Sequence, residues 1–216
     1  MVKVKICGFT EPEDVGEACR AGADMIGAIV DTPSRRSVTP ERAMNLFSIV
    51  PKPIARVAVM APKEASHAIR IVRELEPDYL QTHGPMTVAE LKEIKEATGV
   101  RIIATLSVPQ RVGEPQKITA QALEIAKVAD FVLADTEHAG AGGGTGLTHD
   151  WNVSRLMRET IDRPLILAGG LNPSNVRAAI ETVEPYGVDV ASGVESEVGK
   201  KDPKLMREFI RAAKGP

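Results

Sequence analysis

The feature of this sequence that most restricts its fold is a regular alternation between short β-branched runs and longer amphipathic segments. The runs have the length of β-strands, and the segments that follow them carry apolar residues at helical spacing. One run and one segment together have the length of a βα unit, and the alternation continues along the whole chain. Such a pattern is typical of an α/β protein built on a parallel sheet.

The alternation predicts eight strand–helix units. Two of the predicted helices start with a cap residue followed by proline, at Thr39-Pro40 and Asn172-Pro173. Eight units in 216 residues favour a closed (β/α)8 TIM barrel over an open doubly wound sheet, so we expect residues 1–216 to form a single catalytic domain. The predicted strands are Val2–Cys7, Asp24–Val30, Ile54–Met60, Asp78–His83, Arg101–Leu106, Asp130–Asp135, Pro164–Ala168 and Val188–Ser192. The predicted helices are Glu11–Ala21, Pro40–Ile49, Lys63–Leu75, Thr87–Ala97, Ala120–Val128, Val153–Ile161, Pro173–Thr182 and Pro203–Ala213.

Composition and charge restrict the class of partner. The chain is 43% hydrophobic and 26% charged with a net charge of -2, as in ordinary globular proteins. Its Lys and Arg residues are scattered over the predicted helices, whereas a nucleic-acid-binding protein gathers them in a stripe with aromatic residues. The segment Met1–Cys7 is too charged for a signal peptide, and no apolar run approaches the ~18 residues of a membrane span. We therefore expect a cytoplasmic protein with a small soluble ligand, no nucleic-acid partner and no membrane contact.

Strand parity predicts which side chains point into the barrel, because successive side chains of a strand alternate between its two faces. In each strand the apolar parity suits the side that faces the helices, which leaves the polar parity inside. The inward polar residues are then Lys3, Lys5 and Cys7 of the first strand, Gln81 and His83 of the fourth, Asp135 of the sixth and Asp189 of the eighth. We expect Cys7, Gln81, His83 and Asp135 to converge at the carboxyl end of the barrel, where barrel enzymes hold their active sites, with Asp189 slightly deeper.

The residues themselves leave alternatives open. Cys7 alone would be interpreted as a small buried hydrophobe, but Lys5 shares its face, and a nearby cation lowers the pKa of a thiol. Asp135 could cap a helix or bind loop amides, although its inward parity favours catalysis. Cys19 has apolar neighbours at helical spacing and is expected in the core, and a reducing cytosol favours free thiols at both cysteines. The histidines show no metal-ligand spacing, so we expect no metal site.

Two glycine turns predict an anion site. Gly169-Gly170 follows the seventh predicted strand, and Ser192-Gly193 occupies the matching place after the eighth. The loops after these two strands form the phosphate site of many (β/α)8 barrels, because glycine lets backbone N–H groups approach an anion closely. The alternative is a pair of tight turns that require positive φ. Two matched turns in adjacent units favour phosphate binding and hence a small phosphorylated ligand.

Motifs along nearly the whole chain resemble the phosphoribosylanthranilate isomerase family of tryptophan biosynthesis. They are Val4-Lys5-Ile6-Cys7-Gly8-Phe9-Thr10, Ser34-Arg35-Arg36-Ser37-Val38-Thr39-Pro40, Leu80-Gln81-Thr82-His83-Gly84, Asp135-Thr136, Ala168-Gly169-Gly170-Leu171-Asn172-Pro173 and Asp189-Val190-Ala191-Ser192-Gly193-Val194-Glu195. The resemblance implies an Amadori rearrangement of N-(5-phosphoribosyl)anthranilate without a cofactor. It implies Cys7 as general base, Asp135 as general acid and Arg36 facing the anthranilate. From their inward parity, we expect Lys5, Gln81, His83 and Asp189 to be substrate-binding residues. Arg35 is expected to be solvated.

Some positions depart from the family pattern. Thr82 stands where Leu is common, and His149 stands where Phe is usual, after a longer glycine-rich loop at Ala139–Gly146. Two other functions stay open. The dual-substrate isomerase of histidine and tryptophan biosynthesis has an aspartate on its first strand, so Cys7 argues against it; a non-catalytic barrel that binds a phosphorylated metabolite would leave the converging polar residues unexplained. The sequence is compatible with a monomer or a homodimer.

Overall fold

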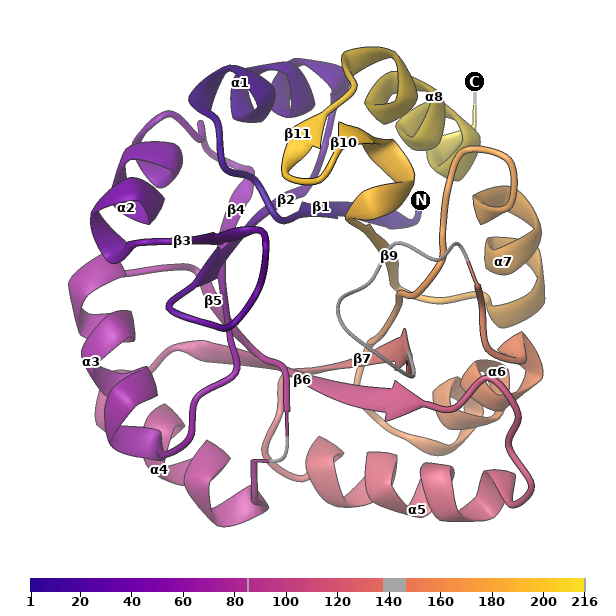
Figure 1. The fold of residues 1–216 in the computed structure, drawn as a ribbon. Coiled ribbons are helices and arrows are strands. Elements are labelled where there is room, and N and C mark those ends of the chain that lie inside the picture. The colour runs from indigo at the N-terminus through magenta and orange to yellow at the C-terminus, as the bar shows by residue number, and fades with distance from the viewer. Residues whose placement is uncertain (85, 138–146, 216) are drawn as a thin grey trace.

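The structure is a computed structural model that describes residues 1–84, 86–137 and 147–215, and it forms a closed barrel of parallel strands (Figure 1). Neighbouring strands pair in the order β1-β9-β8-β7-β6-β5-β4-β2, and β1 also pairs with β2, which closes the ring. The closed (β/α)8 barrel is therefore confirmed and the open sheet is wrong. The barrel strands are β1 (Lys3–Cys7), β2 (Met25–Val30), β4 (Ala55–Met60), β5 (Tyr79–Thr82), β6 (Arg101–Val108), β7 (Phe131–Thr136), β8 (Leu165–Leu167) and β9 (Gly187–Val190).

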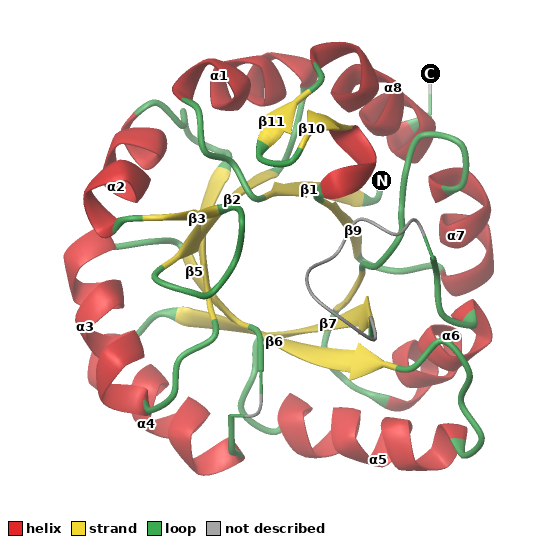
Figure 2. Ribbon diagram, in the orientation of Figure 1, coloured by secondary structure: helices red, strands yellow, loops and turns green. Residues whose placement is uncertain are grey.

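Helices surround the barrel as an outer ring (Figure 2). They are α1 (Pro12–Ala21), α2 (Pro40–Ser48), α3 (Ala65–Leu75), α4 (Val88–Thr98), α5 (Pro115–Ala126), α6 (Trp151–Thr160), α7 (Val176–Val183) and α8 (Pro203–Lys214). Three short strands were not predicted: β3 (Ser37–Val38) pairs with β2, and β10 (Glu195–Glu197) and β11 (Lys200–Lys201) form a hairpin beyond β9. The 3-10 turn η1 (Ser192–Val194) leads into that hairpin. In the described part of the chain, none of the helices has the length and apolar character needed to cross a membrane.

The caps were predicted with mixed success. The Thr39 side chain accepts a hydrogen bond from the Arg42 backbone N–H, which confirms this N-cap. The N-cap predicted at Asn172 is wrong, because α7 begins at Val176 with Asn175 before it. Asn172 instead stabilises the preceding turn, where its Oδ1 accepts from the Ser174 backbone N–H at 2.9 Å.

Two apolar layers confirm the parity argument. Val4 and Ile6 belong to the layer between barrel and helices, and Cys7 belongs to a separate cluster inside the barrel. Lys3 shares the inward parity but lies at the amino-terminal rim, where its Nζ is 3.0 Å from Asp24 Oδ1 and its side chain is exposed. An inward-pointing side chain is therefore buried only where it lies beyond the amino-terminal rim of the barrel, as Lys5 and Cys7 do.

Aromatic side chains close the amino-terminal end of the barrel. The rings of Tyr79 and Phe131 meet edge to face with centroids 5.5 Å apart, and Tyr186 lies 5.3 Å from Phe131 on the other side. The Arg101 guanidinium stacks 4.0 Å over the Tyr79 ring. This floor leaves the carboxyl ends of the strands as the open side of the barrel interior.

Candidate active site

A buried ion pair lies beside Cys7 at the carboxyl end of β1. Parallel pairing of β1 with β9 places Lys5 directly opposite Asp189, and Lys5 Nζ donates to Asp189 Oδ1 at 2.8 Å. Both side chains are almost completely buried. Gly27 of β2 makes room for this group, because a Cβ there would lie 3.0 Å from Cys7 Sγ and 3.3 Å from Lys5 Nζ. The structure thus brings Lys5, Cys7 and Asp189 together, which agrees with the inward position predicted for all three.

The electrostatics of Cys7 differ from the sequence-based expectation. Burial raises the pKa of the Cys7 thiol, and the nearby positive charges of Lys5 and Lys201 offset this effect only in part. Asp189 adds to the rise, because it holds Lys5 and places a negative charge near the sulfur. The expectation that Lys5 would leave Cys7 with a lowered pKa is therefore wrong, and the thiol form predominates at neutral pH.

Opposite substitutions in the ion pair should move the pKa of Cys7 in opposite directions. Lys5→Met removes a cation and should raise the pKa of Cys7. Asp189→Asn removes an anion and releases Lys5 from its ion pair, so this variant should lower the pKa of Cys7. The measurement is the NMR chemical shift of the labelled Cys7 Cβ across a pH titration, in a Cys19→Ala background. Lys3→Met, on the exposed end of the same strand, is the control without effect. Shifts of the same sign in both variants would contradict this account.

Polar groups on another wall of the barrel face the ion pair. Asp135 lies near the end of β7, which β8 and β9 separate from β1. His83 is half-exposed just beyond β5, with its Nδ1 4.0 Å from Asp135 Oδ2. Gln81 lies deeper and is buried, and its Oε1 has no hydrogen-bond partner among the described residues. A polar substrate could therefore meet acceptors and a carboxyl group on the wall opposite Cys7.

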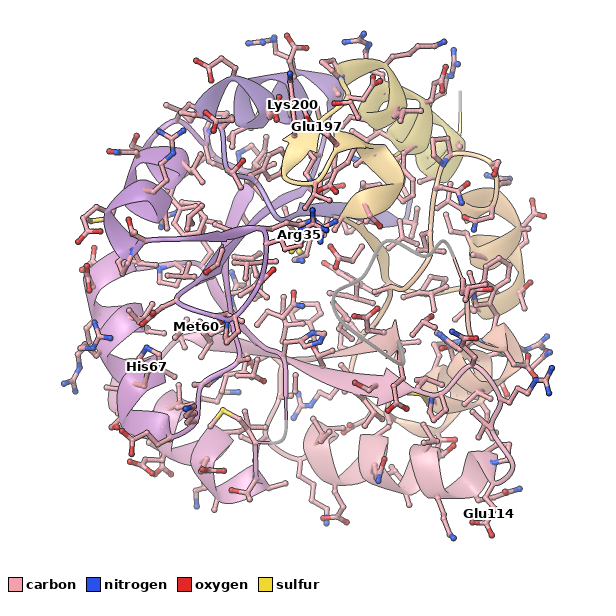
Figure 3. All side chains as sticks on the ribbon, in the orientation of Figure 1. Arg35, Met60, His67, Glu114, Glu197 and Lys200 are labelled. Atoms are coloured by element: carbon pink, nitrogen blue, oxygen red, sulfur yellow. The ribbon has the colours of Figure 1, made fainter. Side chains whose placement is uncertain are left out.

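Arg36, in the loop after β2, pairs with a carboxylate on the hairpin after β9 for which no role was predicted. Its Nε and Nη2 donate to Glu195 Oε1 and Oε2 at 2.8 and 2.7 Å. Lys201 Nζ donates to the same Oε1 at 2.9 Å. Burial opposes the ionisation of Glu195, yet these two cations outweigh it and lower the pKa of the carboxyl. Arg35, by contrast, is exposed as expected, and Figure 3 shows it over the opening of the barrel.

The two glycine turns lie against each other. Gly169 and Gly170 have φ of 87° and 66°, so the alternative interpretation as turn glycines holds for this pair. A Cβ at Gly169 would overlap Thr136, and a Cβ at Gly193 would overlap the Leu171 carbonyl oxygen. The turn after β9 therefore packs backbone to backbone on the turn after β8. Close packing around the two turns therefore requires glycine at both positions.

No group of three or more His, Cys, Asp and Glu side chains in residues 1–84, 86–137 and 147–215 is arranged to hold a metal ion. Independently of this, the thiol of Cys7 and the carboxyl group of Asp135 are groups that can exchange protons with a bound organic molecule.

Known proteins share both the sequence and this architecture. Residues 4–212 match the family model described as N-(5'phosphoribosyl)anthranilate (PRA) isomerase. The chain belongs to the phosphoribosylanthranilate isomerase family. The N-(5'-phosphoribosyl)anthranilate isomerase of Haloferax volcanii is 43% identical over 216 residues, covering 99% of this chain and 94% of the relative. The phosphoribosylanthranilate isomerase crystal structure from Thermotoga maritima superposes with a TM-score of 0.89 at 35% identity, and both chains are covered completely. A complex of such an isomerase with reduced 1-(o-carboxyphenylamino)-1-deoxyribulose 5-phosphate gives 0.85 at 33% identity, again over 100% of both chains.

The departure from the isomerase family at His149 has a structural explanation. The His149 ring is buried, with Nδ1 2.8 Å from Thr136 Oγ1 and Nε2 2.6 Å from Ser154 Oγ. Burial lowers its pKa to about 4, so the ring is neutral and donates to one hydroxyl while accepting from the other. His149 thus fixes Thr136, the neighbour of Asp135, to helix α6. The glycine-rich loop Ala139–Gly146 expected at the active site lies outside the described residues.

Three residues of this isomerase site were not assigned by sequence reasoning. Gly27 lies inside a strand, where a glycine marks close approach of another group, so its signal was present but weak. Glu195 and Lys201 lie on a hairpin after the last barrel strand, where parity arguments do not apply. Glu195 ends the family motif that starts at Asp189, which is a signal for it, whereas Lys201 has only its charge in a short segment after a barrel strand.

Proposed function

We infer that this chain isomerises N-(5'-phosphoribosyl)anthranilate to 1-(2-carboxyphenylamino)-1-deoxyribulose 5-phosphate in tryptophan biosynthesis. The observation that carries the proposal is the position of Cys7 beside the Lys5–Asp189 ion pair, with Asp135 on strand β7 at the same carboxyl end of the barrel. A proton donor and a proton acceptor on different walls suit a reaction that moves protons at two separate atoms of one sugar. Membership of the isomerase family supports the same activity.

We assign the first proton transfer to Asp135. Its carboxyl group donates a proton to the ribose ring oxygen, and the bond between that oxygen and C1' breaks. The lone pair of the anthranilate nitrogen then forms a double bond with C1', which gives an open-chain iminium ion. The Asp135 carboxylate that results lies 4.0 Å from the half-exposed His83.

We assign the second proton transfer to Cys7. The iminium ion makes the C2' hydrogen acidic, and the Cys7 thiolate removes it while the electron pair forms a C1'–C2' double bond. The enolamine then tautomerises to the ketone by losing the 2'-hydroxyl proton and gaining one at C1'. Because burial favours the thiol, we infer that Lys5 and Lys201 stabilise the small thiolate fraction that reacts.

We propose the turns at Gly169-Gly170 and Ser192-Gly193 as the phosphate site, and we propose that Gln81, His83 and Asp189 contact the ribose. The backbone of both turns is close together and free of bulky side chains, which suits an anion held by peptide N–H groups. Arg36 would then meet the anthranilate at the other side of the mouth, because a planar guanidinium pairs with a carboxylate.

The phosphate assignment predicts a large rise in KM for Gly170→Val, because the added bulk would separate the anion from the backbone amides. Gly99→Val is the matched control, since Gly99 has a similar φ of 71° but ends helix α4 at the far end of the barrel. Steady-state kinetics of both variants, with thermal unfolding to confirm folding, provide the measurement. A folded Gly170→Val variant with unchanged KM would exclude this turn from phosphate binding.

We also propose a domain organisation, an oligomeric state and a cellular location for the enzyme. We propose that residues 1–216 act as one catalytic domain, as a monomer or a homodimer, which sedimentation would distinguish. We place it in the cytoplasm, because a phosphorylated substrate carries charge that keeps it from crossing a membrane unaided. A steady-state assay with phosphoribosylanthranilate, followed by the loss of its fluorescence, tests the activity itself. Absence of turnover in the folded protein would exclude it.

A further inference from the structure

A buried carboxylate joins two loops above the barrel. Glu195 accepts two hydrogen bonds from Arg36 of the loop after β2, and one from Lys201 of strand β11. The exposed fraction of the side chain is 5% for Glu195, 9% for Arg36 and 0% for Lys201. Ion pairs this deeply buried have a well-defined geometry, because a charge that moves away from its partner is left without solvation.

Lys201 is itself held on several sides. Its Nζ also donates to the Ala191 carbonyl oxygen at 3.1 Å, and its backbone N–H donates to Asp14 Oδ2 at 2.8 Å. The ammonium group lies 5.6 Å from the centre of the Phe9 ring. Lys201 therefore fixes Glu195 to the scaffold, and Glu195 in turn fixes the guanidinium.

The guanidinium also has little freedom on its other side. Gly8, with φ of 78°, lies under the Arg36 side chain, and a Cβ there would be 2.8 Å from Arg36 Cδ. The pair with Glu195 uses two of the five N–H groups of the guanidinium. Three N–H groups lie outside this pair, so the same side chain has donors for a second carboxylate.

The local charge favours an anionic ligand. Lys5, Arg36 and Lys201 are cations around Cys7, whereas Asp189 and Glu195 are the carboxylates paired with them. When all five groups are ionised they carry one net positive charge, which favours a bound carboxylate. Burial lowers the pKa of Lys201, and the neighbouring Glu195 carboxylate acts against this effect. Glu195 thus holds Arg36 in place, and the five charged groups together still keep a net positive charge when they are ionised.

We propose that Glu195, anchored by Lys201, is a positioning residue that holds Arg36 at a fixed distance from the turn at Ser192-Gly193. Glu195 follows that turn directly through η1, so one short segment orients the groups for both charged ends of the substrate. The inference rests on the proposed function, in which the two ends are a carboxylate and a phosphate. Glu195 acts through Arg36 and does not touch the reacting atoms.

Kinetics of Glu195→Gln, Arg36→Met and the double variant test this role. Glu195→Gln should raise KM about tenfold or more and lower kcat less, because a charge-assisted pair that orients the binding residue is lost. The double variant should have the KM of Arg36→Met alone, because Glu195 acts only through the arginine. Multiplied KM effects, or an unchanged KM in Glu195→Gln, would overturn the proposal.

Two further variants separate positioning from folding. Lys201→Met leaves the Arg36–Glu195 pair intact and should raise KM by a smaller factor, which provides a milder test if Glu195→Gln does not fold. Asp130→Asn is the control, because Asp130 accepts from Lys95 Nζ at 2.8 Å in a partly exposed pair at the opposite end of the barrel. It should lower thermal stability without changing KM. A rise in KM in Asp130→Asn equal to that in Glu195→Gln would show that the effect is general destabilisation.

A readout without substrate distinguishes failure of this inference from failure of the proposed function. The Arg36 Nε–H should give a slowly exchanging NMR signal, which is assigned by its absence in Arg36→Met. The signal should broaden or exchange rapidly in Glu195→Gln. If the wild-type protein does not turn over phosphoribosylanthranilate, the proposed function fails. The Nε–H signal would still show whether Glu195 holds the Arg36 guanidinium. An unchanged Nε–H signal in Glu195→Gln would overturn the positioning role even in an active enzyme.

Discussion

Replacing Cys7 by alanine should lower kcat by about 10²–10⁴-fold, the usual contribution of a general base, with little change in KM. The C2' hydrogen would then have no acceptor on its side of the cavity. Substrate binding should survive, because the proposed phosphate turns and Arg36 lie on other loops. Single-turnover and steady-state kinetics of the pure variant provide the measurement. Cys19→Ala is the matched control, since that half-buried thiol lies in helix α1.

The pH dependence separates loss of a base from loss of packing. In the wild type, kcat/KM should rise with pH as Cys7 loses its proton, and the raised pKa of this thiol places the rise on the alkaline side of an ordinary cysteine. Cys7→Ser should move this limb further up, because a hydroxyl has a far higher pKa than a thiol. Near wild-type turnover in Cys7→Ala would mean that another inward group is the base, with Asp189 the first to examine.

The sequence was sufficient to predict the closed barrel and the inward-pointing residues of its strands. Strand parity is a local rule, so it placed Lys5, Cys7 and Asp189 on the inner face before any pairing was known. The register of β1 against β9 then made Lys5 and Asp189 direct neighbours, which parity alone does not specify. The net shift of the Cys7 pKa depends on burial and on that pairing, and the expectation from Lys5 alone was therefore wrong.

Loop residues were less predictable, because their positions depend on contacts between segments far apart in sequence. Glu195 and Arg36 meet across 159 positions, and neither lies in a barrel strand. Asn172 shows the same limit at close range. Its cap-and-proline pattern fits a helix start, yet its side chain satisfies the Ser174 N–H in a turn before helix α7. Local propensity identified a polar turn there without fixing where the helix begins.

Asp135→Asn should also lower kcat by about 10²–10⁴-fold, because an amide of nearly the same shape is too weak an acid to protonate the ring oxygen. The step that stops is ring opening, which precedes the step assigned to Cys7. Glu137→Gln is the matched control, since Glu137 is an exposed acid on the same segment. It should leave kcat unchanged in the same assay.

Because ring opening precedes proton removal from C2', Cys7→Ala and Asp135→Asn should accumulate different intermediates. Cys7→Ala can still open the ring, so it should build up the open-chain imine, and borohydride should trap it as the reduced amine. Asp135→Asn should retain the closed ring and yield no trapped product, although kcat falls by a similar factor. Equal trapping in both variants would mean that Asp135 does not open the ring. His83, whose Nδ1 lies 4.0 Å from Asp135 Oδ2, would then be the next candidate for the acid.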